Sequence, residues 1–187
     1  MKKILALLLI PVLAGCLTSS MPDVSRWMLE YRGAAAPAKD VRFEAVRVSQ
    51  IVVCPPYNSI NMAVLRANGT VALDAYNEFA AQPALLLKGP IYDALTGSGL
   101  FRTVVGPSSS VQTSVAAEVL VTRFALDCRT EGRRLATVAV LLRILDRREP
   151  AVIVKGDAAV DAADGNYGAA FSRAVSQAFE SALGQVR

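Results

Sequence analysis

The strongest pattern in the sequence is an alternation of apolar and polar positions in three consecutive segments near the C-terminal end. These segments cover residues 115–127, 134–146 and 151–160, and the residues between them, 128–133 and 147–150, are mostly polar or charged. Because successive side chains of a strand point to opposite faces, a period of two predicts β-strands. We therefore expect an antiparallel meander of three strands.

The middle strand of this meander is largely apolar on both faces. One face carries Ala136, Val138, Val140, Leu142 and Ile144. The other face carries Leu135, Thr137, Ala139, Leu141 and Arg143. A strand that is apolar on both faces is usually covered on both sides. If helices cover only one side, the other face is a candidate surface for a partner.

Five more strands are predicted upstream, at residues 26–31, 41–53, 62–66, 70–73 and 100–105. The second of them should end at Pro55 and Pro56, because proline has no N–H to donate to a neighbouring strand. The third and fourth flank an Asn68-Gly69 step, which favours a tight hairpin turn.

Two helices complete the pattern. The first is expected over about residues 76–97, divided by Pro83 and Pro90 and ended by Gly97-Ser98-Gly99. The second is expected over about residues 165–183, where apolar residues recur at spacings of three and four. Its opposite, polar face carries Ser172, Arg173, Ser176, Gln177 and Glu180. The order of elements predicts an α+β fold, a two-layer sandwich of two helices packed on one mixed, mostly antiparallel sheet.

The N-terminal segment has the features of an export signal. Lys2 and Lys3 precede an apolar run of residues 4–14, which is too short to cross a bilayer. The run ends in Leu13-Ala14-Gly15-Cys16, which resembles the lipobox of bacterial lipoproteins. This resemblance implies cleavage between Gly15 and Cys16, diacylglycerol on the Cys16 thiol and a further acyl chain, such as palmitate, on the freed amine. The alternative is an ordinary secretory signal that happens to contain a cysteine.

These features divide the chain into a signal peptide at residues 1–15, a lipidated cysteine and tether at 16–24, and a single domain at 25–187. Leu17 follows the cysteine, where Gram-negative lipoproteins kept in the inner membrane typically have aspartate. We therefore expect a lipid-anchored protein on the periplasmic face of the outer membrane.

Composition narrows the classes of function. The net charge is +4, and two of those charges leave with the signal, which is too mild to favour nucleic acid as a partner. The sequence contains no histidine, which removes the commonest general base and metal ligand, so we expect no enzyme, no metal and no cofactor beyond the acyl chains on Cys16. Cys54 and Cys128 are either joined by a disulfide or buried as free thiols.

Few polar residues suggest a site. Asp161 and Asp164 precede the last helix and most simply cap it or complement its dipole. Asp74 and Glu78 would be adjacent on a helical turn, but two carboxylates alone are weak evidence of acid–base chemistry. Arginines are dense at the turns of the meander, which indicates either solvated turns that protect sheet edges or a surface for an acidic partner or anionic lipid headgroups. The candidates for that surface are Arg129, Arg133, Arg134, Arg147 and Arg148.

The order of these features resembles one family, the ABC-type transport auxiliary lipoproteins of the PqiC/YmbA-like group. The segments that carry the resemblance are the lipobox at Cys16, residues 26–31 (RWMLEY), 76–80 (YNEFA), 91–105 (IYDALTGSGLFRTVV) and 119–124 (VLVTRF), and the closing amphipathic helix. Two features depart from it. Phe79 stands where the family usually has tryptophan, and Lys88-Gly89-Pro90 interrupts a helix that is normally continuous.

The resemblance implies a non-enzymatic accessory to an MCE-type ABC transporter that moves lipids between the inner and outer membranes. Its partners would be an MCE-domain protein and the ABC transporter components, and it would commonly form a homo-oligomer. Two alternatives stay open. Residues 97–105 also resemble part of TolB-like and CsgG-like envelope lipoproteins, which implies an assembly role, and the apolar strands are compatible with a lipid-binding lipoprotein.

Overall fold

The three C-terminal strands form the predicted antiparallel meander and the centre of the sheet. A computed structural model of the protein describes residues 23–33, 38 and 40–186. The meander consists of β6 (Val115–Cys128), β7 (Leu135–Asp146) and β8 (Glu149–Asp161). Arg147 and Arg148 alone join β7 to β8, and both have positive φ, as a tight hairpin turn of this kind requires. The turn is therefore shorter than the predicted 147–150.

The sheet forks along β6, because two different strands pair with its two ends on the side away from β7. The other strands are β1 (Ser25–Trp27), β2 (Phe43–Val53), β3 (Asn61–Arg66), β4 (Val71–Phe79) and β5 (Phe101–Val105). β2 pairs in parallel with the first half of β6 and continues to β5, whereas β3 pairs in parallel with the last residues of β6 and continues to β4 and β1. The described residues thus form an eight-stranded mixed sheet whose longest pairings are antiparallel.

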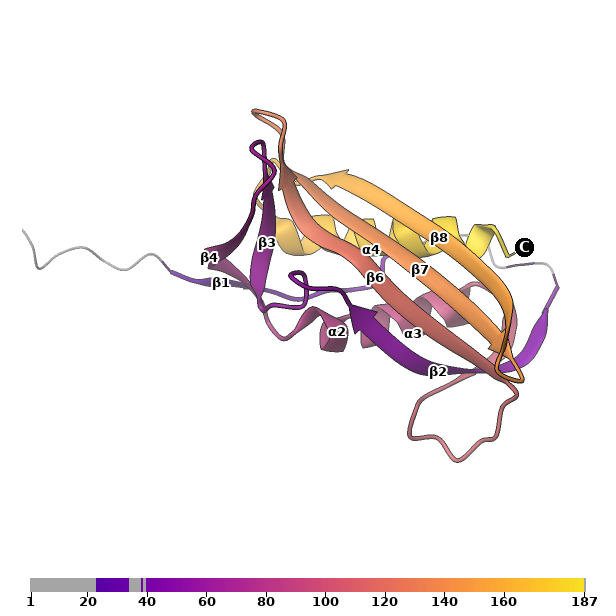
Figure 1. Ribbon diagram of the computed structural model, residues 1–187. Helices are drawn as coiled ribbons and strands as arrows, with labels where there is room; N and C mark the ends of the chain where they lie inside the picture. Colours follow the sequence, from indigo (N-terminus) through magenta and orange to yellow (C-terminus); the bar gives the residue numbers. More distant parts are fainter. Residues whose placement is uncertain (1–22, 34–37, 39, 187) are drawn as a thin grey trace, which may run out of the picture.

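The helices lie on one face of this sheet (Figure 1). They are α2 (Pro83–Leu86), α3 (Lys88–Gly97) and α4 (Tyr167–Gly184). The predicted arrangement of helices packed on a mixed sheet is therefore confirmed. In addition, Gly99 has a φ of 69°, which confirms the left-handed glycine predicted after the first helical region.

The predicted start of the first helix is wrong. Residues 76–79 belong to β4 instead, because Phe79 pairs with Trp27 of β1 and Glu78 pairs with Asn61 of β3. The helical region begins at Pro83, in a position where proline is favoured because its missing N–H has no helical partner. Pro90 lies in the first turn of α3, where the N–H groups likewise have no partner within the helix, so it does not break α3.

Helix α4 approaches β8 closely at a glycine. A Cβ atom added to Gly156 would lie only 1.8 Å from the carbonyl oxygen of Ala178, so no side chain fits there. On the sheet side, the predicted apolar stripe of α4 is buried, and its Phe171 contacts Phe79 and Phe124. These three rings join α4 to the shared strand β6 and to the branch of the sheet that contains β4.

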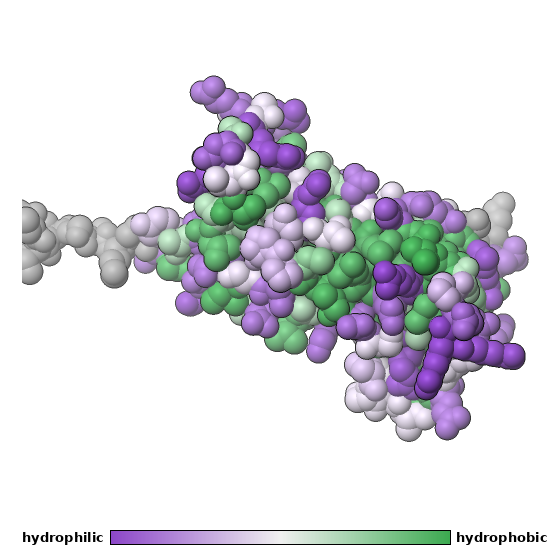
Figure 2. Space-filling view, viewed as in Figure 1, coloured by the Kyte–Doolittle hydropathy of each residue, from purple (hydrophilic) through white to green (hydrophobic). Residues whose placement is uncertain are grey.

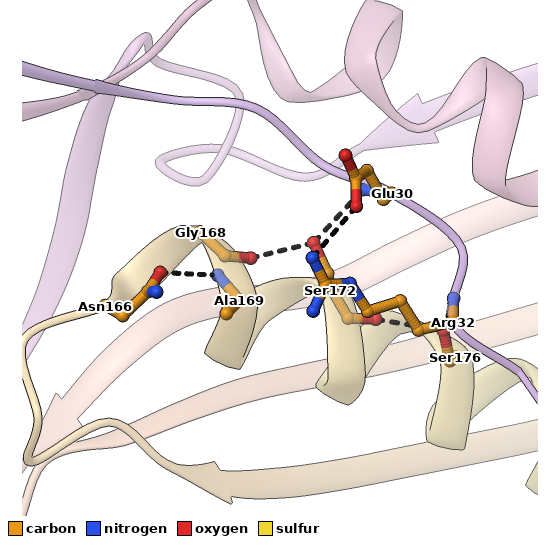
Figure 3. A network of polar contacts seen from close by, with 7 residues as sticks. All are labelled: Glu30, Arg32, Asn166, Gly168, Ala169, Ser172 and Ser176. Atoms are coloured by element: carbon orange, nitrogen blue, oxygen red, sulfur yellow. Dashed lines mark hydrogen bonds and ion pairs between the residues drawn. The ribbon is translucent and has the colours of Figure 1, made fainter.

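The other side of α4 is also covered, by an extended segment at residues 28–33 that we call the strap. The backbone N–H of Glu30 donates to Ser172 Oγ at 3.0 Å, and that of Arg32 donates to Ser176 Oγ at 2.7 Å (Figure 3). Each serine hydroxyl also donates to the carbonyl oxygen four residues earlier in the helix. The predicted exposed face of α4 is therefore wrong for Ser172 and Ser176, which are buried.

The spacing of the two serines matches the spacing of the strap. Residues four apart in a helix are separated by about 6 Å along its axis. Alternate residues of an extended chain are about 6.6 Å apart. One turn above Ser172, a Cβ on Gly168 would lie 3.0 Å from the Trp27 ring, so a small residue is needed there as well. The sequence prediction of a strand over 26–31 is correct only to Trp27, because beyond it the chain bonds to helix side chains rather than to another strand.

We predict that the double variant Ser172→Ala, Ser176→Ala loosens the strap. It leaves the N–H groups of Glu30 and Arg32 without their acceptors on the helix, and each of these part-buried hydrogen bonds contributes about 0.5–1.5 kcal/mol. The amides of Glu30 and Arg32 should then exchange with solvent faster, as measured by native-state hydrogen exchange. Ser181→Ala, an exposed change in the same helix, is the control and should leave exchange of these amides unchanged. Equal exchange in wild type and double variant would contradict the role of the two serines.

Candidate functional site

The sheet surface that faces away from the helices carries a row of apolar side chains across three strands. Val52 of β2 is the register partner of Leu120 in β6, and Leu120 is the partner of Leu141 in β7. Directly paired residues point to the same face of a sheet, so these side chains are neighbours. Their flanking residues Val119, Val121 and Leu142 point toward the helices and are buried.

A second, more polar row lies beside the first. It consists of Gln50, Glu118, Arg143 and Ile153 on four successive strands. Arg143 Nη1 lies 3.9 Å from Glu118 Oε2, which forms an ion pair across the strands, and Ile153 is 55% exposed. We call the two rows, Val52, Leu120 and Leu141 with Gln50, Glu118, Arg143 and Ile153, the open face.

The open face forms a shallow depression lined by six of its seven residues, all except Ile153. Figure 2 shows apolar side chains over β6 and β7 on this side of the molecule, surrounded by polar ones. In the described residues helices cover only one side of the meander, which is the condition under which the sequence predicted a partner surface on the other side. Leu141 and Arg143, which belong to the predicted second face of the middle strand, lie in the open face. Its use as a partner surface stays a prediction.

The arginines predicted to form one surface lie in two groups. Arg129, Arg133 and Arg134 belong to the turn between β6 and β7, whereas Arg147 and Arg148 form the turn at the other end of β7. A strand of 12 residues spans about 40 Å, so the five side chains do not share a surface. The sequence alone did not show this separation, because the distance between the two turns depends on the length of the extended strand β7 between them.

Two arginines of the first group have partners within the protein. Arg129 donates to both carboxylate oxygens of Asp127, with 2.6 Å from Nη2 to Oδ2, and Arg134 Nη1 donates to the Tyr167 hydroxyl at 3.0 Å. These contacts stabilise the β6–β7 turn, and they leave Arg133 as the exposed arginine of this group for which no such contact is described.

The Asp127–Arg129 pair leads to a pH prediction. The hydrogen bond from Arg129 lowers the pKa of Asp127, and partial burial opposes this more weakly. A carboxyl group with a lowered folded-state pKa stabilises the fold above its unfolded pKa of about 4, and this contribution is lost as the pH falls through that range. The stability difference between wild type and Asp127→Asn should therefore shrink as the pH falls from about 7 to about 3, as measured by urea unfolding. A difference independent of pH would contradict it.

The two remaining cysteines do not form a disulfide. Both are free, and burial raises the pKa of the Cys128 thiol. Cys54 lies beside Val121 of β6, because its N–H donates to the carbonyl oxygen of that residue. Cys128 is the last residue of β6, seven residues beyond Val121. At about 3.3 Å per residue the two positions are on the order of 20 Å apart, well beyond the roughly 7 Å limit for bridged Cα atoms. The structure favours the second of the two alternatives, free thiols.

The polar residues considered for chemistry have structural partners instead. Asp74 accepts hydrogen bonds from the N–H groups of Tyr76 and Asn77 at an irregularity in β4, so it is not on a helix. Glu78 forms an ion pair with Arg26 at 3.3 Å. The described residues contain no group of three or more acidic, cysteine or histidine side chains placed to hold a metal.

The residue that caps α4 was missed. Asn166 Oδ1 accepts from the N–H of Ala169, so asparagine is the N-cap. Asp161 and Asp164, predicted as caps, accept instead from Ala163 and Asn166 in the preceding turn. Asparagine is as good a cap as aspartate, so either choice agreed with the sequence pattern.

Arg47 has a role that no sequence pattern indicated. It donates to the backbone carbonyl oxygens of Gly106, Pro107 and Ser109, and also to that of Val111. The arginine thereby fixes the loop between β5 and β6, which contains the polar run Ser108–Ser110. Carbonyl acceptors are invisible in a sequence, because every residue has one.

A groove of about 340 Å³ lies between β2, at residues 48–51, and the first helical region, α2 and α3. Ile51, Ala84, Leu85 and Pro107 contribute apolar walls, and Lys88 lies among the lining residues. The hydroxyl oxygen of Tyr92, another lining residue, is buried without a hydrogen-bond partner. The groove has the size of a small ligand site but is open to solvent.

The predicted cleavage and lipidation site, Gly15 and Cys16, lies outside the described residues. Among the helices of the described part, none is long and apolar enough to span a bilayer. The tether and anchor are therefore expectations from the sequence alone.

Comparison with known proteins adds evidence about the fold. No family model matches the sequence, and no curated protein matches it. Among solved structures, a Xanthomonas campestris protein of the DUF330 family is similar over 87% of this chain and 98% of its own, with a TM-score of 0.70 and 16% identity. The two proteins share a fold. An uncharacterized protein is similar over 88% of this chain and 99% of its own, with a TM-score of 0.61 and 12% identity.

These likenesses cover nearly the whole of each chain, so the forked sheet with its helices on one face is a complete fold shared with those two proteins. A Caulobacter crescentus protein described as a lipoprotein is similar at a TM-score of only 0.37 and 20% identity, over 55% of this chain and 79% of its own, a likeness too weak to indicate a shared fold. At these identities the likeness extends to the fold and not to function.

Proposed function

We propose that the protein is a lipoprotein anchored through Cys16 to the periplasmic face of the outer membrane. In this proposal it is a non-enzymatic auxiliary component of an MCE-type ABC transporter that moves lipids between the inner and outer membranes. The lipobox-like sequence supports the anchor, and the family resemblance supports the partner. The observation that carries the proposal is the open face, a sheet surface that no element of the described residues covers.

The composition of the open face suits a protein partner. An apolar row of Val52, Leu120 and Leu141 lies beside a row containing the Glu118–Arg143 pair. Protein interfaces commonly combine a buried apolar centre with a polar rim, and a few central residues contribute most of the binding energy. We therefore propose that the MCE-domain protein binds here, with Leu120 and Leu141 at the centre of the contact.

We predict that Leu120→Lys weakens partner binding at least tenfold, because truncating or charging a central interface residue commonly costs about 2 kcal/mol or more. The long aliphatic part of the introduced lysine side chain can lie along the sheet while its ammonium group reaches water, so the domain should stay folded. Co-purification from crosslinked cell envelopes gives the readout. Val41→Lys is the control, since Val41 is exposed, precedes β2 and lines neither the open face nor the groove beside α2.

A photoreactive amino acid at position 141 identifies the partner directly. The expected adduct contains an MCE-domain protein, and the same amino acid at the exposed position 41, outside both candidate sites, should not give it. Crosslinks between copies of this chain at position 141 would show that the open face serves the homo-oligomer instead. Recovery of an unrelated envelope complex would reject the transporter proposal and favour the assembly role of TolB-like or CsgG-like lipoproteins.

The groove beside α2 favours a second candidate function, binding of a lipid. Its apolar walls at Ile51, Ala84 and Leu85 suit an acyl chain, and Lys88 suits an anionic headgroup. Native mass spectrometry of the protein purified without its anchor tests this candidate. A bound lipid that is lost in Ala84→Trp, which fills the groove, would support it, and a ligand-free protein would reject it.

A further inference from the structure

We infer that one end of the domain, where the first described residues lie, rests directly on the lipid bilayer through exposed apolar side chains of the residue before β1, of the strap and of β4. The inference rests on the anchor at Cys16 proposed above. The side chains are Val24, Met28, Val71, Leu73 and Tyr76, and we call them the entry patch. All five are among the exposed large apolar side chains of the described residues.

The sheet fixes where the chain enters. β1 pairs in parallel with the end of β4, with Ser25 opposite Asn77. Trp27 Nε1 donates to Asn77 Oδ1 at 3.2 Å, which together with the Arg26–Glu78 ion pair holds β1 in place. Continuing the parallel register places Val24 beside Tyr76. The first described residues therefore run along β4, at the end of the domain that carries the β3–β4 hairpin (Figure 1).

The entry patch is unusually exposed for apolar side chains. Met28 is 61% exposed, Tyr76 52% and Leu73 51%. Figure 2 shows apolar surface over β3 and β4 at this end of the molecule. Contiguous exposed apolar surface indicates an interaction site, and tyrosine is enriched where proteins meet the headgroup region of a bilayer.

The length of the tether selects a membrane as the occupant. Seven residue steps separate Cys16 from Asp23, and an extended chain spans at most about 3.6 Å per residue. An acylated Cys16 would thus keep Asp23 within about 25 Å of the bilayer. A contact across so short a tether is intramolecular, with an effective concentration in the millimolar range, so a modest apolar contact suffices. A protein that bound the entry patch would have to fit into the space of at most about 25 Å between the patch and the bilayer.

The charges at this end make the contact independent of anionic lipid. Arg26 is paired with Glu78, and Arg129 in the adjacent β6–β7 turn is paired with Asp127. The remaining charges at this end, Arg66, Arg133 and Arg134 against Asp23, Asp74 and Glu131, cancel in number, so little net charge is available to attract anionic headgroups. The attraction comes from apolar side chains, and it should be as strong on zwitterionic as on anionic bilayers.

Brominated lipids provide the test. The full-length lipidated protein is incorporated into phosphatidylcholine vesicles that carry bromine on the acyl chains, and tryptophan fluorescence is compared with vesicles without bromine. Tyr76→Trp and, as a second position, Leu73→Trp are measured against wild type, which reports Trp27 alone. Ile153→Trp is the matched control, because Ile153 has similar exposure but lies toward the opposite end of the sheet.

We expect the added tryptophan at 76 or 73 to lose emission to bromine and to shift to shorter wavelength, with no loss at 153. The result should be the same when phosphatidylglycerol replaces part of the phosphatidylcholine. Vesicle flotation separates the two claims. If the protein does not float, the anchor fails and the inference falls with it. If the protein floats but the tryptophans at positions 76 and 73 are not quenched, the anchor stands and the inference is overturned. A photoreactive amino acid at position 76 that crosslinks to a protein in cells would overturn the inference as well.

Discussion

Phe171→Ala is expected to lower the free energy of unfolding by about 3–5 kcal/mol, the range of large truncations in a buried core. The ring centroid of Phe171 in α4 lies 5.3 Å from that of Phe79 in β4 and 4.8 Å from that of Phe124 in β6. All three rings are buried, so the truncation leaves a cavity where the helix meets β6 and β4. Urea unfolding followed by circular dichroism measures the loss, and Tm should fall by roughly 10 °C.

A matched pair at the edge of the core separates this effect from the mere loss of a phenylalanine. Phe43 stacks on Phe101 with centroids 5.5 Å apart, but Phe43 is only partly buried. Phe43→Ala should therefore cost clearly less than Phe171→Ala, because its site is open to water and leaves a smaller cavity. Equal losses for the two variants would contradict the central place of the three-ring contact.

Gly156→Ala is expected to be the second most damaging substitution, although it adds a single methyl group. The added Cβ would lie 1.8 Å from the carbonyl oxygen of Ala178 and 2.9 Å from the backbone nitrogen of Ala182. Both atoms belong to the backbone of α4, so the helix must move away from β8. Overpacking of this kind typically costs about 1–3 kcal/mol and sometimes more. We expect the upper part of that range, because no flexible side chain can give way.

Gly97→Ala is the control for this substitution. Gly97 is the last residue of α3, and an added Cβ would meet nothing within 4 Å. Alanine is a better helix former than glycine, so Gly97→Ala should leave stability unchanged or raise it by up to about 1 kcal/mol. If Gly156→Ala proved as mild as Gly97→Ala in urea unfolding, the close packing of α4 on β8 would be wrong.

The parts of the fold that the sequence predicted are those set by local pattern. The meander strands show a period of two, the last helix shows recurrence at three and four, and Asn68-Gly69 marks the turn between β3 and β4. Residues 76–79 were assigned to a helix because their strand character comes from pairing with β1, about 50 residues earlier, and with the first residue of β3 across an irregularity in the hairpin. The strap was missed for the same reason, because its hydrogen-bond acceptors are two serines about 140 residues away.

The candidate site was predictable in one strand only. The apolar second face of β7, with Leu141, indicated a surface, but its neighbours Leu120 and Val52 depend on the register between strands. The fork of the sheet, which makes β2 and β3 share β6, has no signal in the sequence. For the arginines the prediction was wrong in another way. They were grouped into one surface because they are close in the sequence, but they lie in two turns at the two ends of β7.

The proposed anchor and the strap together suggest how the protein would act by position. The strap bonds to α4 at Ser172 and Ser176, and β1 bonds to β4, so the entry point of the tether is fixed relative to the open face. A lipid on Cys16 would then hold the domain near the bilayer with a limited range of orientations. The open face would be presented to a partner at a set height above the membrane.

The most direct test of this account is the mass of the N-terminal peptide of the mature protein isolated from envelopes. We predict a peptide that begins at Cys16 and carries a diacylglycerol group and an additional acyl chain, recovered from the outer-membrane fraction. A peptide with an unmodified residue 16, from a protein found free in solution, would contradict the account.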